Sequence, residues 1–174
     1  MDLFSLLKET INWSSPLILK RGDYLCEPPR KDQNIYWVKE GLLRIFTVEE
    51  GQDYGVRFGY EGDLISVLDS YIKGEPSRFS VQALRKTTLV SCSKEAFENR
   101  LKQYPELRDL WMEGLYQLIY DMLEREQDLM IADPRQRLQR VLGRSPRLFQ
   151  EVPHKYIASY LRMSPETLSR LLNS

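Results

Sequence analysis

Short apolar stretches recur at regular spacing between residues 17 and 92, and turns that contain glycine separate several of them. The stretches are rich in β-branched, aromatic and leucine residues, which fit a pleated, half-buried surface. A series of short strands of this kind is typical of a sandwich or a barrel. We therefore expect a β sandwich or barrel with strands at 17–19, 24–25, 35–38, 42–47, 54–58, 64–65, 79–84 and 88–92.

The turn Lys39-Glu40-Gly41 separates two of the best-marked strands, 35–38 and 42–47. Strands that follow one another closely along the chain usually pair through such a turn. We therefore expect these two to form a hairpin. A short amphipathic helix is expected before the strands, at 1–13, and another helix after them, at 94–103.

The longest expected helix runs from 105 to about 132, between Pro105 in its first turn and the helix-breaking Asp133-Pro134. A helix of about 27 residues is about 40 Å long, which exceeds the flank of a small β domain. Its apolar residues recur at steps of four and three, a pattern that fits a dimer seam, although the core of a single chain uses it more often. These residues are Trp111, Leu115, Leu118, Met122 and Leu129, with Arg125 as the one interruption.

Residues 153–172 predict two short helices around a tight turn. Ser164 is a favourable N-cap for the second helix, and Pro165 fits its first position. Leu168 and its apolar neighbours then face the partner helix, which leaves the polar residues toward solvent. Such a pair can place polar side chains in a DNA major groove. An ordinary helical hairpin without that function fits the pattern as well.

The chain has 174 residues and a formal net charge of zero, which by itself argues against a nucleic-acid binder. The charge is unevenly distributed, however. From residue 133 onward eight cations stand against three anions, an excess of +5, so the remainder carries −5. A basic segment on an acidic body suits a module that approaches phosphate, although a merely solvated surface is also compatible with so modest an excess.

The chain has two cysteines, Cys26 and Cys92, and one histidine, His154. Two thiols do not hold an iron–sulfur cluster within one chain. A single histidine forms neither a His-based triad in the β domain nor a typical zinc site. No apolar signal segment and no membrane-spanning run is present. We expect a reduced, cytoplasmic protein without catalytic residues, metal or cofactor.

Three stretches together resemble the Crp/Fnr family of bacterial transcription regulators. The series Glu166-Thr167-Leu168-Ser169-Arg170 resembles its recognition helix, residues 36–45 resemble its second hairpin, and Gly62-Asp63-Leu64 stands where the family has Gly-Glu-Leu. Arg162 replaces the glycine that is usual at the turn, so we expect a left-handed backbone at a residue that is not glycine.

The resemblance implies an α+β fold in three segments. Residues 1–104 would form a β-roll effector domain, a cupin-like double-stranded β-helix of the jelly-roll type. Residues 105–132 would form a dimerisation helix, and residues 133–174 a helix-turn-helix domain that lacks a full wing because the sequence stops at Ser174. The resemblance also implies a homodimer on an inverted-repeat operator, with double-stranded DNA, RNA polymerase and an unidentified small-molecule effector as candidate partners.

The resemblance assigns DNA contacts to residues of the two final helices. Arg170 can fork onto guanine of a half-site resembling TTGA, Glu166 can accept from cytosine, and hydroxyl groups can bond to base or phosphate. Lys155 is expected on phosphate. The candidate DNA-binding residues are Lys155, Ser164, Glu166, Thr167, Ser169 and Arg170.

The expected effector pocket departs from that of cyclic-nucleotide-binding relatives. Aligned on the strand that follows, Ser77 stands where the relatives have the phosphate-binding Arg, and Arg78 lies one residue further along, on the opposite face of a strand. Phe79 replaces a small residue, and Asp63 is shorter than Glu. We expect no binding of cyclic AMP or cyclic GMP. The pocket, at Asp63, Leu64, Ser77, Arg78 and Phe79, would then hold another small or anionic ligand, or be filled.

Two classes of function remain open from the sequence. The first is a Crp/Fnr-type DNA-binding transcription regulator. The second is a signalling or interaction protein that keeps the effector domain but has lost DNA binding.

Overall fold

The computed structural model describes residues 3–173, with side chains from residue 5 onward. Its contacts group into two compact units. Unit 1 comprises residues up to Phe46 and residues 58–115, and unit 2 comprises residues 47–57 together with residues from 116 onward. The predicted segments 1–104, 105–132 and 133–174 therefore remain a prediction about domains.

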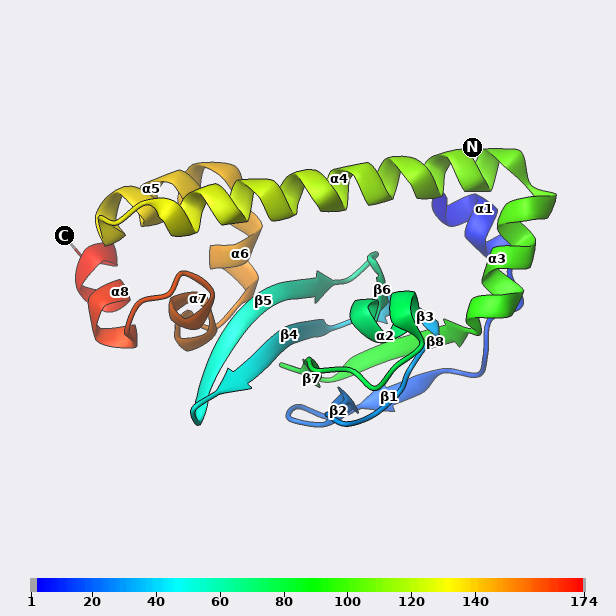
Figure 1. The fold of residues 1–174 in the computed structure, drawn as a ribbon, viewed down its shortest axis with the longest axis horizontal. Coiled ribbons are helices and arrows are strands. Elements are labelled where there is room, and N and C mark those ends of the chain that lie inside the picture. Colours follow the sequence, from blue (N-terminus) through cyan, green and yellow to red (C-terminus); the bar gives the residue numbers. More distant parts are fainter. Residues whose placement is uncertain (1–2, 174) are drawn as a thin grey trace. The chain divides into compact units, whose positions relative to one another are not determined.

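Antiparallel strands dominate unit 1 and form two four-stranded sheets within the described residues (Figure 1). One sheet has the order β1-β8-β3-β6 and the other β2-β7-β4-β5. This arrangement confirms the expected β-roll and the mixture of strands and helices. The strands are β1 (Leu17–Leu19), β2 (Tyr24–Cys26), β3 (Ile35–Glu40), β4 (Leu42–Glu49), β5 (Gln52–Tyr60), β6 (Leu64–Ser66), β7 (Ser80–Ala83) and β8 (Thr87–Cys92).

The expected hairpin between β3 and β4 is wrong, because the two strands lie in different sheets. β3 pairs with β6 and β8, whereas β4 pairs with β7 and is next to β5. Gly41 turns the chain from one sheet to the other with φ of +117°. A side chain there would also lie 2.3 Å from Thr87 Oγ1, so glycine is needed at this corner.

Alternate residues of the strands fill two separate apolar clusters. Tyr36, Val38 and Ile65 point into the inner cluster, with Val81 and Leu89. Ile35 and Trp37 point to the opposite face and pack with Phe97 and other residues of the outer cluster. The period of two along a strand accounts for this separation. The interior of the roll is therefore packed with aliphatic and aromatic side chains.

Helices cover the outer cluster of unit 1. They are α1 (Leu3–Thr10), α3 (Lys94–Gln103) and the first part of α4 (Pro105–Met130). Ser93 caps α3 by accepting a hydrogen bond from the amide of Ala96. A further short helix, α2 (Leu68–Lys73), lies between β6 and β7 in the chain and ends at Gly74 in a left-handed conformation. These helices agree with the predicted ones to within a few residues.

Unit 2 contains the tip of the β4–β5 hairpin, the second part of α4 and four short helices. These are α5 (Pro134–Arg144), α6 (Pro146–Glu151), α7 (His154–Tyr160) and α8 (Pro165–Leu172). Asp128 of α4 is 1% exposed. Its carboxylate receives Arg140 Nε at 2.8 Å and the guanidinium of Arg144, so two cations join α4 to α5.

In the described part of the chain, no helix is both long and apolar enough to cross a membrane. The same residues contain no cluster of three or more His, Cys, Asp or Glu side chains placed to hold a metal ion.

Candidate functional site

α7 and α8 in unit 2 form two helices around a tight turn, as the sequence predicts. Ile157, Ala158 and Leu168 are buried between them. Arg162 at the turn has φ of +55°, which confirms the expected left-handed backbone. Ser164 Oγ accepts from the amide of Thr167 at 3.1 Å, and Pro165 occupies the first turn, so the predicted start of α8 is confirmed.

The candidate DNA-binding residues lie at the surface of unit 2. Glu166, Ser169 and Arg170 are exposed on α8. Thr167 is half-buried, and its hydroxyl accepts from Ser164. Hydrogen bonds from its own backbone amide and from Ser164 hold the pKa of Glu166 below its usual value. Lys155 is exposed on α7, with Nζ 4.6 Å from the centre of the Tyr156 ring. The structure therefore brings these polar groups together on one helix pair, and their role in DNA binding stays a prediction.

Residues that the sequence reasoning missed hold this helix pair in place. Arg137 is 8% exposed and donates from Nη1 to the carbonyl of Leu161 at 2.8 Å, next to the turn. Ser159 Oγ accepts from the amide of Gly55 at 2.9 Å and donates to the carbonyl of Asp53 at 2.8 Å. Arg125 donates to the carbonyl of Gly55 and stacks on Tyr160. Arg125 interrupted the apolar pattern of α4, and this contact explains why.

The predicted effector-pocket residues do not share one environment in unit 1. Asp63 accepts a hydrogen bond from the amide of Tyr60 at 2.9 Å, inside its own turn. Leu64 packs in the outer cluster with Trp37 and Phe97, whereas its neighbour Ile65 points into the roll. Leu64 and Ile65 thus lie on opposite faces of β6, because successive side chains of a strand face opposite sides. The assignment of Leu64 to an effector pocket stays a prediction.

Ser77, Arg78 and Phe79 form the loop that precedes β7, and this loop is organised around Asp69 of α2. Ser77 Oγ donates to Asp69 Oδ1 at 2.8 Å, and the amide of Arg78 donates to Asp69 Oδ2 at 2.9 Å. Ser77 is 3% exposed, and its hydroxyl also accepts from the amide of Phe79. No sequence signal marks Asp69, because its partners are eight and nine residues away.

A second carboxylate, Asp32, lies at the same end of the roll. It is 4% exposed and accepts from the Tyr36 hydroxyl at 2.7 Å. Burial, and then this hydrogen bond, raise the pKa of Tyr36. Burial also raises the pKa of the Cys26 thiol to about 11, and the charges of Asp32 and Asp69 add to that effect against the opposing charge of Arg30. This part of unit 1 is therefore rich in negative charge.

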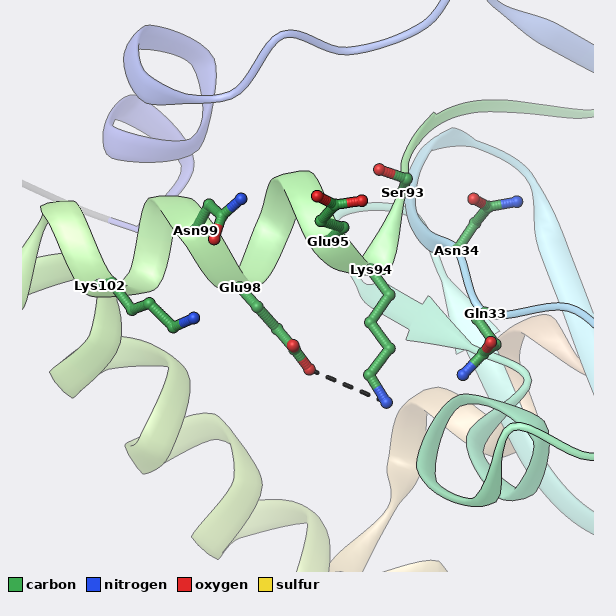
Figure 2. Close-up of a pocket in the computed structure, with 8 residues that line it drawn as sticks. All are labelled: Gln33, Asn34, Ser93, Lys94, Glu95, Glu98, Asn99 and Lys102. Carbon is green, nitrogen blue, oxygen red and sulfur yellow. Dashed lines mark ion pairs between the residues drawn. The ribbon is translucent and has the colours of Figure 1, made fainter.

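A surface hollow of about 570 Å³ lies beside the start of α3, where Gln33 and Asn34 face Ser93 and the helix (Figure 2). Its charged groups balance, since Lys94 and Lys102 accompany Glu95 and Glu98. Lys94 Nζ donates to the carbonyl of Tyr71 at 2.6 Å and lies 3.9 Å from Glu98. The hollow offers no convergent set of groups that would select one class of ligand.

The expected dimer residues of α4 are mostly half-buried within the single chain. Trp111 packs edge-on against Phe97 with ring centres 4.9 Å apart, and among the five residues Met122 alone is strongly exposed, at 55%. Besides Met122, four apolar residues between positions 116 and 123 of α4 are exposed. They form the α4 patch, which consists of Tyr116, Ile119, Tyr120 and Leu123. The dimer prediction itself stays a prediction.

Comparisons with known proteins agree with this architecture. Neuropathy target esterase sws of Drosophila willistoni is 25% identical over 165 residues, which cover 91% of this chain and 10% of that protein. The chain thus spans about a tenth of the length of the curated relatives it matches.

Two solved structures show the same fold. A mutant of CooA from Carboxydothermus hydrogenoformans has a TM-score of 0.77 at 21% identity, over 97% of this chain and 77% of its own. TTHA1359, a transcriptional regulator of the CRP/FNR family from Thermus thermophilus, has a TM-score of 0.69 at 18% identity, over 91% of this chain and 84% of its own.

The family defined as "Cyclic nucleotide-binding domain" matches residues 16–104, just over half of the chain. The matched region contains β1–β8 and α3 and therefore covers every strand of the β-roll. On this evidence the chain belongs to the cyclic nucleotide-binding domain family.

Proposed function

We propose that this chain is a homodimeric, DNA-binding transcription regulator of the CRP/FNR type. The observation that carries the proposal is the α7–turn–α8 pair, with Glu166, Ser169 and Arg170 exposed on a helix whose opposite face is buried at Leu168. The likeness of fold to regulators of that family supports it. In this proposal α8 enters the major groove, and the exposed Lys155 contacts phosphate.

Selection from random duplexes at low salt, followed by mobility shift, tests the proposal. We expect an inverted repeat with half-sites in successive major grooves. Arg170→Ala should weaken binding to that site by about 1 to 3 kcal/mol and relax the preference at one base pair. Arg21→Ala removes an exposed cation from the turn between β1 and β2 and should leave binding unchanged. If no symmetric site emerges and Arg170→Ala has no effect, the proposal is wrong.

We propose that dimerisation uses the α4 patch. Aromatic and aliphatic side chains that gather on one helix face mark a surface for a protein partner, and in this proposal the partner is a second copy. Sedimentation should give a dimer at micromolar concentration. Ile119→Glu together with Leu123→Glu should give a folded monomer, because both side chains are exposed in the single chain but would place charges in the seam. A wild-type monomer would contradict the assignment.

The alternative function is a signalling or interaction protein that uses the effector domain without binding DNA. The match to one part of much longer Drosophila proteins is compatible with it. The selection experiment separates the two functions. A chain that enriches no DNA sequence but still binds a protein or a small molecule favours this alternative. In both cases we propose that the chain itself is not an enzyme.

A further inference from the structure

The loop between α2 and β7 binds a carboxylate of its own chain as it would bind an external anion. Both oxygens of Asp69 are engaged, one by the hydroxyl of Ser77 and the other by the backbone amide of Arg78. The amide of Ser70 adds a third donor, to Asp69 Oδ1 at 2.9 Å. Hydroxyl and backbone amide groups are also the donors that proteins use to hold phosphate oxygens.

The position of these donors in the chain links them to nucleotide binding. They lie within the region that matches the cyclic nucleotide-binding domain, and by the family resemblance Ser77 stands at the position of the phosphate-binding Arg. The carboxylate of Asp69 therefore takes up hydrogen bonds at the place where a cyclic phosphate is expected.

We propose that Asp69 is a built-in anionic ligand, which occupies the phosphate position of this domain and excludes cyclic nucleotides from it. The assignment rests on membership of the family and not on DNA binding. Asp69 is then the residue that determines ligand specificity. Replacing it by a small neutral residue should make the amide of Arg78 available to phosphate, together with the hydroxyl of Ser77, which also lies 3.1 Å from the carbonyl of Phe79.

The charges around the loop support this assignment. An incoming phosphate would meet the carboxylates of Asp69 and the buried Asp32, while Arg30, whose carbonyl accepts from the amide of Ser77, supplies one opposing positive charge. Two like charges at one site repel, and low solvent exposure strengthens the repulsion. Removing Asp69 therefore has two effects, since it vacates the donors and lowers the negative charge.

The test compares wild type, Asp69→Ala, Ser77→Arg and the double variant as full chains. The probes are inorganic phosphate and cyclic AMP, and the readouts are calorimetry and thermal unfolding. Wild type should not bind cyclic AMP and should bind phosphate only weakly, so phosphate should leave its melting temperature almost unchanged. Asp69→Ala should be stabilised by phosphate and bind it about tenfold to a hundredfold more tightly than wild type, as expected for recovered charge-assisted hydrogen bonds.

The Ser77→Arg variants separate the role of Asp69 from that of a missing arginine. In the single variant the new guanidinium should pair with Asp69, so cyclic AMP should still not bind. The double variant should bind cyclic AMP, because the arginine then has no internal partner. Glu75→Ala is the matched control, since it removes an exposed carboxylate from the same loop and should not create an anion site.

Three results would overturn the assignment. They are binding of cyclic AMP by wild type, equal binding by the single and double Ser77→Arg variants, or folded Asp69→Ala protein that phosphate does not stabilise. If Asp69→Ala fails to fold, Asp69→Ser replaces it in the phosphate measurements, and the single Ser77→Arg variant is still tested for binding of cyclic AMP. Selection of DNA by wild type is measured separately, so failure here leaves the proposed function unaffected.

Discussion

The two units each hold one carboxylate through several hydrogen bonds, but with opposite chemistry. In unit 1, Asp69 receives neutral donors, namely a hydroxyl and backbone amides. In unit 2, Asp128 receives the guanidinium groups of Arg140 and Arg144. Loss of Asp128 would therefore leave Arg140 and Arg144 with Glu124 as their remaining carboxylate partner, whereas loss of Asp69 would leave neutral donors that can bind water or another anion. The same side-chain type is a structural ion-pair partner in one unit and a substitute ligand in the other.

The largest effect is expected at Asp128. Asp128→Ala should lower the free energy of unfolding by about 2 to 4 kcal/mol, because Arg140 and Arg144 lose their buried carboxylate and keep only the partly exposed Glu124. Urea denaturation measures the change. Asp121→Ala on the same helix is the control, since this exposed side chain receives only Gln117 and should change stability by less than about 0.5 kcal/mol. Equal losses in the two variants would contradict the distinction.

A smaller loss is expected at Asp69. Asp69→Ala should cost about 1 to 3 kcal/mol, the range for leaving buried donors unsatisfied. The value should fall below that for Asp128, because Arg78 is exposed and its amide can turn to water. The same urea titrations give both numbers. A cost at Asp69 equal to that at Asp128 would remove the contrast between neutral and charged partners.

A neutral contact in unit 2 sharpens the comparison further. Ser164→Ala removes the cap of α8 and should cost about 0.5 to 2 kcal/mol, since the amide of Thr167 loses its acceptor. Circular dichroism during thermal unfolding follows the change, and Ser164→Asp should restore the cap. If Ser164→Ala and Asp128→Ala lower the free energy of unfolding equally, then the loss depends on the location in unit 2 and not on the charge of the contact.

The smallest effect at neutral pH is expected at Glu98, a carboxylate of unit 1 near the surface. Glu98→Gln should cost less than about 0.5 kcal/mol, because its pairing with Lys94 is long and screened by solvent. The effect of Glu98 on stability should appear at alkaline pH instead, because Glu98 acts on the pKa of Tyr71. Burial, followed by the charge of Glu98, raises the pKa of Tyr71 from 10 to about 12.

The raised pKa fixes the sign of the pH dependence. The folded state prefers the neutral phenol, so the stability from this shift is present below pH 10 and is lost between pH 10 and about 12. In Glu98→Gln the pKa of Tyr71 should move down. Spectrophotometric titration with Tyr71→Phe as the reference measures it, and an unchanged pKa would contradict the assigned role of Glu98.

Local signals in the sequence predicted most elements of the fold. Strand positions followed from short apolar stretches and turn residues, and the start of α8 followed from Ser164 and Pro165, because capping depends on neighbours in the chain. The left-handed backbone at Arg162 was also predicted. These features depend on interactions within a few residues, so the local sequence is enough to predict them.

Pairing between distant segments was not predictable in the same way. The sequence could not show that β3 and β4 enter different sheets, since adjacent strands usually pair. The expected stripe of α4 did not coincide with the exposed patch, because only the packed chain decides which apolar side a helix buries. The packing of Leu64 in the outer cluster was likewise decided by the folded chain.

The candidate sites show the same difference between local and long-range interactions. The sequence by itself determined a sandwich or barrel of short strands, the order of elements and the polar series from Glu166 to Arg170, because periodicity, capping and turn chemistry are local. The β-roll was what the family resemblance implied. Tertiary structure alone decided that Asp69 accepts hydrogen bonds from the loop before β7. It also decided that Arg137 and Ser159 hold the helix pair in place. A hydrogen bond or ion pair between distant segments forms only when folding brings them together, so the spacing of residues along the chain does not predict it.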